Sequence, residues 1–166
     1  MRVTLQAKSV IAASPEEVWS RVTHPDGINY ELAPVMRMTV PKELQGKTVH
    51  DMELGQRICR SWFLLFGLIP FEYDDIVIAE LEHGRRFKET SSMLSIRAWE
   101  HERTLRPVPL GTEITDRVTF ELRRPFAAIP GANSLVANML SRLFRHRHRR
   151  LEQWFAGRSG NARAAE

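Results

Sequence analysis

Apolar and polar residues alternate along most of the chain as far as Leu122, a pattern typical of half-buried β-strands. Glycine and proline interrupt the alternation at intervals and mark the turns between strands, as at Gly67, Pro70 and Gly84. The strands predicted in this way lie at residues 3–13, 33–41, 56–65, 73–82 and 86–91, followed by two longer strands within 96–122.

Two short helices and one long helix are expected between and after these strands. Ser14, Pro15 and Glu17 together form a helix-start signal, and the helix should end before Pro25. Residues 26–32 predict a second short helix or a turn. The long helix should run from about residue 131 to 155, with Gly157 as a stop. Its broad apolar face would comprise Leu135, Val136, Met139, Leu140, Leu143, Phe144, Leu151, Trp154 and Phe155.

The order of these elements predicts the fold class. One strand, two short helices, strands in hairpin series and a final long helix are typical of an α+β domain with an antiparallel sheet. The economical arrangement is a curved sheet wrapped around the C-terminal helix. We expect a single domain over residues 1–157 and a polar, flexible tail over 158–166.

The two strands within 96–122 carry the most suggestive polar cluster. A register with Leu105 opposite Ile114 places Arg103 opposite Asp116, and His101 falls on the same face. That face also receives Trp99 opposite Phe120, whereas the other face is polar throughout, with Glu102 opposite Arg117. The first face should therefore look at the long helix.

Two interpretations of this cluster stay open. The Arg103–Asp116 pair could simply hold sheet and helix together, because buried charges need partners. Alternatively, the pair and His101 line a cavity, in which His101 could act as an acid or base near neutral pH. Tyr30 is a second candidate for proton transfer, and with His24 and Glu31 it could form a polar rim at the entrance.

The distribution of charge and the cysteine content limit the kinds of function that the chain can have. The 166 residues carry a formal charge of +4, but much of it lies in residues 142–150 (RLFRHRHRR), which we interpret as a solvated helix face rather than a nucleic-acid site. The single Cys59 predicts a small core residue and excludes an intrachain disulfide. Asp74 and Asp75 are adjacent in a strand and point to opposite faces, so no metal site is predicted.

Segment 63–71 (FLLFGLIPF), from Phe63 to Phe71, places apolar residues at a hairpin tip. It could fold over the mouth of a cavity, or form a homodimer or membrane-surface contact. No signal peptide or transmembrane segment is expected, because the longest apolar run, residues 62–71, is about half of a membrane span. A cytoplasmic protein is the simplest interpretation.

Several motifs in order resemble one superfamily. SPEEVW after the first strand, APVM, the block F…W.H.RTL…GT.ITD.V.F and the helical FRHRHRRL are similar to the SRPBCC superfamily. This is the START, Bet v 1 and polyketide-cyclase-like group, and bacterial ligand-binding members are the most similar. The resemblance implies the helix-grip fold, which is a seven-stranded antiparallel sheet around the C-terminal helix, with two short helices after the first strand.

The resemblance also implies an apolar cavity between sheet and helix. The expected function is binding of a hydrophobic small molecule or lipid without a cofactor. The alternative is a polyketide cyclase or dehydratase acting in the same cavity. The ligand pocket predicted on this basis comprises Trp62, Trp99, His101, Arg103, Asp116, Phe120, Met139 and Leu143. The identity of the ligand, a reaction and the oligomeric state are left open.

Overall fold

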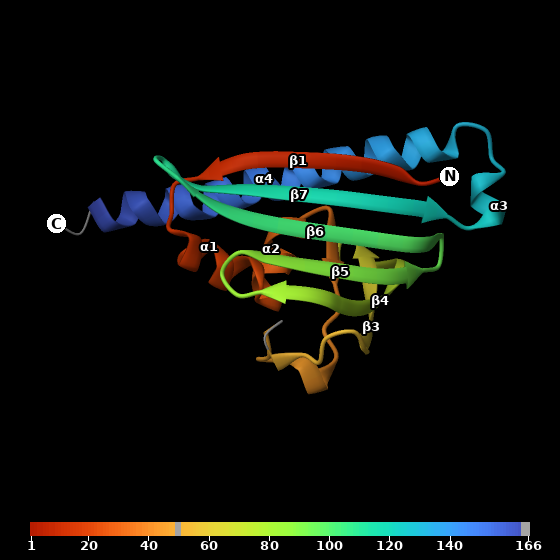
Figure 1. The fold of residues 1–166 in the computed structure, drawn as a ribbon, viewed down its shortest axis with the longest axis horizontal. Coiled ribbons are helices and arrows are strands. Elements are labelled where there is room, and N and C mark those ends of the chain that lie inside the picture. Colours follow the sequence, from red (N-terminus) through yellow and green to blue (C-terminus); the bar gives the residue numbers. More distant parts are fainter. Residues whose placement is uncertain (49–50, 164–166) are drawn as a thin grey trace.

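In a computed structural model of the chain, a curved antiparallel sheet wraps around one side of a long C-terminal helix (Figure 1). The structure describes residues 1–48 and 51–163, without the side chains of residues 43 and 159–163. The elements are β1 (Val3–Ile11), α1 (Pro15–Val22), α2 (Pro25–Leu32), β2 (Met36–Met38), η1 (Lys42–Leu44), β3 (Arg57–Leu65), β4 (Ile69–Glu82), β5 (Arg86–Met93), β6 (Ile96–Val108), β7 (Gly111–Leu122), α3 (Arg124–Ala127) and α4 (Ala132–Arg163). The strand order is β1-β7-β6-β5-β4-β3-β2, and the predicted α+β helix-grip architecture is confirmed.

The predicted start of α1 is confirmed as a capping box. Ser14 Oγ accepts a hydrogen bond from the Glu17 amide at 3.3 Å, and the Ser14 amide donates to Glu17 Oε2 at 3.0 Å. These two bonds satisfy amides that the first helical turn cannot satisfy itself. The helix thereby holds Val18, Trp19 and Val22 against the sheet.

We expect Ser14→Ala to lower the free energy of unfolding by about 1 kcal/mol, because it removes the hydroxyl that accepts from the Glu17 amide and donates to Glu17 Oε2. Chemical denaturation followed by circular dichroism measures the change. Ser20→Ala, the same substitution at an exposed position of the same helix, is the control and should leave stability unchanged or slightly higher. An equal loss in both variants would contradict a capping role.

The register predicted for the hairpin of β6 and β7 is confirmed. Leu105 lies opposite Ile114, Arg103 opposite Asp116 and Trp99 opposite Phe120. On the outer, convex face Glu102 lies opposite Arg117 as predicted. Its carboxylate nevertheless accepts a hydrogen bond from Arg86 of β5, at 2.9 Å.

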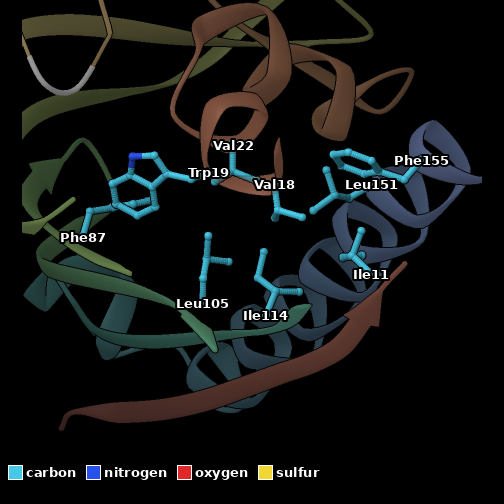
Figure 2. Packing of buried hydrophobic residues seen from close by; sticks show 9 residues of the cluster. All are labelled: Ile11, Val18, Trp19, Val22, Phe87, Leu105, Ile114, Leu151 and Phe155. Carbon is cyan, nitrogen blue, oxygen red and sulfur yellow. The ribbon is translucent and has the colours of Figure 1, made fainter. Parts of the chain in front are cut away.

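The inner, concave face of the sheet carries two hydrophobic clusters. One joins α1 and the C-terminal half of α4 to the sheet, and Figure 2 shows its side chains pointing toward one another. Its residues are Ile11, Val18, Trp19, Val22, Phe87, Leu105, Ile114, Leu151 and Phe155. The second cluster packs Trp99 and Phe120 against Phe144 of α4. Polar side chains of β6, β7 and α4 lie between the apolar groups on this concave face.

The second predicted strand is much shorter than expected. Only Met36–Met38 pairs with β3, whereas the prediction covered residues 33–41. Proline lacks an amide donor, so Pro34 and Pro41 limit the ladder on both sides. The free edge of β2 is closed by Asn29 of α2, whose side-chain amide bonds both the carbonyl and the amide of Met38, at 3.0 and 2.7 Å.

The C-terminal helix is longer and less buried than predicted. It continues through Gly157 to Arg163, so residues 158–163 of the predicted flexible tail are helical, and residues 164–166 lie outside the described residues. Leu135 and Met139 are 62% and 61% exposed, which corrects the predicted apolar face. The loop expected over residues 42–55 contains η1, and positions 49 and 50 lie outside the described residues.

Candidate ligand-binding site

A buried ionic network lies at the centre of the concave face, with Asp116 of β7 as one hub. Arg103 of β6 donates from Nε to Asp116 Oδ1 and from Nη2 to Oδ2, both at 2.7 Å. His101 Nε2 donates to Oδ1 and His148 Nε2 of α4 donates to Oδ2, each at 2.8 Å. Since a carboxylate can only accept, both imidazoles carry hydrogen on Nε2, and the other ring nitrogen of His148, Nδ1, is hydrogen-bonded to Ser9 Oγ at 2.8 Å.

Glu31 of α2 is the second hub. Arg103 donates to both of its carboxylate oxygens at 3.0 Å, so one guanidinium joins two carboxylates. Arg147 of α4 donates to Glu31 Oε2 from Nε, also at 3.0 Å. The side chains of Glu31, Arg103 and Asp116 are fully buried. The network therefore ties α2, the sheet and α4 together without contact to solvent at its centre.

The protonation states follow from these contacts. Burial alone would raise the pKa of Asp116, but the charge and hydrogen bonds of Arg103 hold that pKa well below its usual range. Burial would likewise raise the pKa of Glu31, and Arg103 and Arg147 together lower it. Burial lowers the pKa of His101, which is therefore neutral at pH 7. Two cations and two anions balance one another in the network.

The network corrects several sequence predictions. His101 does not lack a partner, because it donates to Asp116. Glu31 is fully buried and belongs to the network rather than to a polar rim. The segment 142–150 is not wholly a solvated face, since Arg147 and His148 are buried. Their spacing from Phe144 and Leu151 on the same helical stripe was the signal that could have identified them.

His24 and Tyr30, the other two residues proposed for a polar rim, do not belong to the network. His24 is the N-cap of α2, and its Nδ1 accepts a hydrogen bond from the Asp26 amide at 3.3 Å. Tyr30 packs edge-on against Trp154, with ring centroids 5.0 Å apart, and the guanidinium of Arg150 lies 4.0 Å from its ring centroid. Both residues thus hold α2 in place.

An apolar cleft lies beside the network, on the concave face of β3 and β4. Its walls come from the junction of α1 and α2, from β2 and η1, from Met52, and from the two strands, and its empty space is about 490 Å³ with open solvent included. Its apolar wall includes Met38, Val40, Leu44, Met52, Ile58, Ile76 and Ile78. Cys59 and Ser61 of β3 also line the cleft, whose accessible surface is apolar. Burial raises the pKa of the Cys59 thiol, which stays protonated.

The structure distributes the predicted pocket residues over several places. Arg103, Asp116 and His101 come together in the network, and Trp99 and Phe120 come together in the second core cluster. Trp62 is 42% exposed and packs against Tyr73, on the face of β3 opposite to the cleft-lining Ser61. Met139 is exposed and Leu143 half-buried on α4. The cleft lined by β3 and β4 was not predicted.

Two acidic residues missed by the sequence interpretation lie next to this cleft. Asp74 of β4 is 2% exposed and Glu89 of β5 is half-buried, and both point to the concave face. Burial raises the pKa of Asp74 to about 6. The adjacent Asp75 points to the convex face, where Arg60 donates to both of its carboxylate oxygens at 2.9 and 2.7 Å. The opposite orientation of the two aspartates agrees with the alternation of the strand.

The apolar hairpin tip between β3 and β4 is exposed rather than folded over the cleft. Phe66 is 67% and Leu68 81% accessible to solvent. A homodimer or membrane-surface contact through the segment from Phe63 to Phe71 stays a prediction. Within the part of the chain that the structure describes, no helix has both the length and the apolar character needed to cross a bilayer.

Solved structures with the same fold include three that span most of this chain. Protein CV1439 from Chromobacterium violaceum is 20% identical, with 92% of this chain and 96% of that chain covered and a TM-score of 0.65. A START superfamily protein from Mycobacterium smegmatis is 13% identical, with 94% and 97% covered and a TM-score of 0.62. DynU16, a protein of the dynemicin biosynthetic locus, is 17% identical, with 91% and 46% covered and a TM-score of 0.58.

At these identities the similarity establishes the fold alone, which is the helix-grip fold that the sequence motifs predicted. No curated protein matches the chain in sequence. One family model, described as a domain of unknown function (DUF8410), matches residues 9–155. This match extends from β1 to the buried part of α4, and the chain therefore belongs to the DUF8410 family.

Proposed function

We propose that the chain binds a hydrophobic small molecule or lipid in the cleft on the concave face of β3 and β4. The observation that carries the proposal is the cleft itself, whose wall is largely aliphatic although it stays open to solvent. Apolar surface that remains open in a folded chain is a common feature of ligand sites. The START-type fold of the chain supports the same proposal by analogy.

The buried network holds one side of the rim of the cleft in place in this proposal. Glu31 follows Pro25 on α2, which belongs to the rim of the cleft, and Arg103 fixes that helix to the sheet. A ligand then meets a preorganised surface, and little conformational entropy is lost on binding. Neither Arg103 nor Asp116 lines the cleft, so the pair would affect a ligand only by holding the surrounding elements in place.

A cyclase or dehydratase acting in the same cavity is the second candidate. The similarity to DynU16, which comes from a biosynthetic locus, favours it. His101 is an unfavourable catalyst for this reaction, because it is 4% exposed and its Nε2 hydrogen is already donated to Asp116. We therefore propose binding without catalysis, with the cleft rather than His101 as the part that contacts the ligand.

Filling the cleft tests the proposal directly. In Ile76→Trp the larger side chain occupies the space beside β4, so we expect the affinity for a neutral apolar probe, naphthylmethanol, to fall by at least about tenfold. A heteronuclear NMR titration of the backbone amides measures the dissociation constant and locates the probe. Naphthylmethanol binding that is equal in Ile76→Trp and wild type would contradict the proposal.

Val77→Trp provides the matched control. Val77 is the next residue of β4 and points to the convex face, so the same increase in volume leaves the cleft open. We expect this variant to bind naphthylmethanol as wild type does. The melting temperature of each variant separates a loss of affinity from a loss of folding.

A further inference from the structure

A polar patch formed by Asp74, Glu89 and Ser91 lies beside the cleft on the same face of the sheet. Three residues that line the cleft lie directly opposite this patch in the sheet: Ser61 pairs with Asp74, Ile76 with Ser91, and Ile78 with Glu89. Side chains that are directly opposite share a face, with Cβ atoms about 5 Å apart. The aliphatic wall and the acidic patch are therefore one continuous surface on the concave face.

Two polar atoms of this patch have no partner among the described residues. Asp74 is 2% exposed, yet no donor lies within hydrogen-bond distance and angle of its Oδ1, and Ser91 Oγ is also buried without a partner of that geometry. Ser91 and Glu89 nevertheless lie close enough to Asp74 for their polar groups to lower its pKa, against the effect of burial. The other buried carboxylates of the concave face are satisfied. Glu72, for example, accepts from the amides of Leu94 and Ser95 at 2.6 and 3.1 Å. A buried carboxylate oxygen without a donor is costly for a fold, so its presence beside a cleft indicates a binding function.

Among the described residues no cation forms an ion pair with the patch. The charged and titratable groups around it are Cys59 and Glu72 on the sheet, His101 opposite Glu89, Lys47 at the rim of the cleft, and Arg147 of α4. Lys47 is exposed to solvent. Arg147 donates to Glu31 and His101 to Asp116, although the charge of Arg147 still lowers the pKa of Glu89.

Burial is the largest cause that raises the pKa of both acids, and the charge of Asp74 raises the pKa of Glu89 further, well above its ordinary value. Because the pKa of Asp74 is about 6, this residue is mainly ionised at neutral pH. The patch therefore presents the Asp74 carboxylate, the Glu89 carboxyl group and the Ser91 hydroxyl beside an apolar wall.

We propose that the ligand of this cleft is a hydrophobic amine, whose ammonium group donates to Asp74 Oδ1 and Ser91 Oγ while its apolar body lies along Ile76 and Ile78. This inference rests on the proposed function, because it specifies the polar end of the same ligand. A cation fits the patch better than a hydroxyl group, because only a cation neutralises the buried carboxylate. An anionic ligand would be repelled by Asp74.

A matched pair of probes tests the inference: naphthylmethylamine, which is protonated at neutral pH, and naphthylmethanol, its neutral analogue. We expect wild type to bind the amine more tightly than the alcohol, and Asp74→Asn to weaken amine binding by about 30-fold while alcohol binding changes little. Asp75→Asn removes a carboxylate of the same strand on the convex face and should keep the preference for the amine.

The pH dependence of wild type provides a test that needs no variant. Only ionised Asp74 attracts the amine, and the pKa of Asp74 is about 6, so amine affinity should rise about tenfold between about pH 5 and pH 7. Alcohol affinity should stay constant.

The outcomes separate this inference from the proposed function. If both probes bind the cleft with equal affinity, without pH dependence and equally in Asp74→Asn, the cleft binds apolar molecules and the amine proposal is overturned. If neither probe binds wild type, the proposed function fails and the amine proposal fails with it. An amine preference that is lost only in Asp74→Asn supports both.

Discussion

Replacement of Arg103 by methionine is expected to destabilise the protein strongly. Methionine replaces only the unbranched apolar stem of arginine, so the carboxylates of Asp116 and Glu31 stay buried without their shared cation. Breaking such a buried pair costs about 3–5 kcal/mol in the free energy of unfolding. Thermal unfolding should show a decrease of about 10 °C in the melting temperature.

Arg106→Met is the matched control for this experiment. Arg106 lies three residues further along β6 and pairs with Glu113 at 3.0 Å, but its side chain is 66% exposed. Solvent already screens that pair, so its loss should change stability little. Comparable losses in Arg103→Met and Arg106→Met would show that the buried network contributes no more than a surface ion pair.

A double-mutant cycle with Glu31→Gln locates the cause. In wild type this substitution removes an acceptor of Arg103 and Arg147 and should destabilise the protein. In the Arg103→Met background it removes an uncompensated charge, so the loss should become much smaller or reverse in sign. Additive effects of the two substitutions would contradict an ionic coupling between Glu31 and Arg103.

Local patterns in the sequence were sufficient to predict the strands, the start of α1 and the register of β6 and β7. The alternation of Trp99, His101 and Arg103 identifies one face of β6, and the register that pairs Leu105 with Ile114 places Phe120, Val118 and Asp116 opposite them. The Arg103–Asp116 pair follows from that register. These features depend on residues that are close together in the chain, within one hairpin. They can therefore be predicted from local sequence patterns.

The partners that complete the network could not be predicted in the same way. Glu31 and Arg103 are separated by 72 positions, and Arg147 and Glu31 by 116. Their contact depends on how α2 and α4 pack against the sheet, which no periodicity specifies. The cleft depends on the same packing, because its rim comes from α2, β2 and η1 rather than from the hairpin.

Asp74 shows where more could have been taken from the sequence. Its spacing from Ile76 and Ile78 places it on the same face of β4 as those two apolar residues, and a charge on an apolar face is a signal of function. The sequence interpretation treated Asp74 only as one half of a metal pair with Asp75. The sequence interpretation did not include Glu89. Its position opposite Ile78 depends on how β4 pairs with β5.

Asp74→Asn is expected to stabilise the protein at neutral pH. The pKa of Asp74 is about 6 in the folded chain, against an ordinary value of 3.8, a difference of about two units. Because the folded state holds the proton more tightly, wild-type stability falls as the pH rises from about 4 to 6 and stays low above that range. Two units at 1.36 kcal/mol per unit give a gain of up to about 3 kcal/mol for asparagine at about pH 7.5, and no gain at about pH 4.

Asp75→Asn should show the opposite sign, although it is the neighbouring residue. Hydrogen bonds from Arg60 lower the pKa of Asp75, so the ionised carboxylate stabilises the folded state above its ordinary pKa of 3.8. This contribution is lost as the pH falls through the lower folded value, and asparagine should cause a small loss of stability at neutral pH. Denaturation of both variants at a series of pH values measures the two curves. Parallel curves would mean that Asp74 is no more strained by burial than Asp75. Opposite curves would show that the acid on the cleft wall lowers the stability of the unliganded fold, a cost that a bound cation would offset.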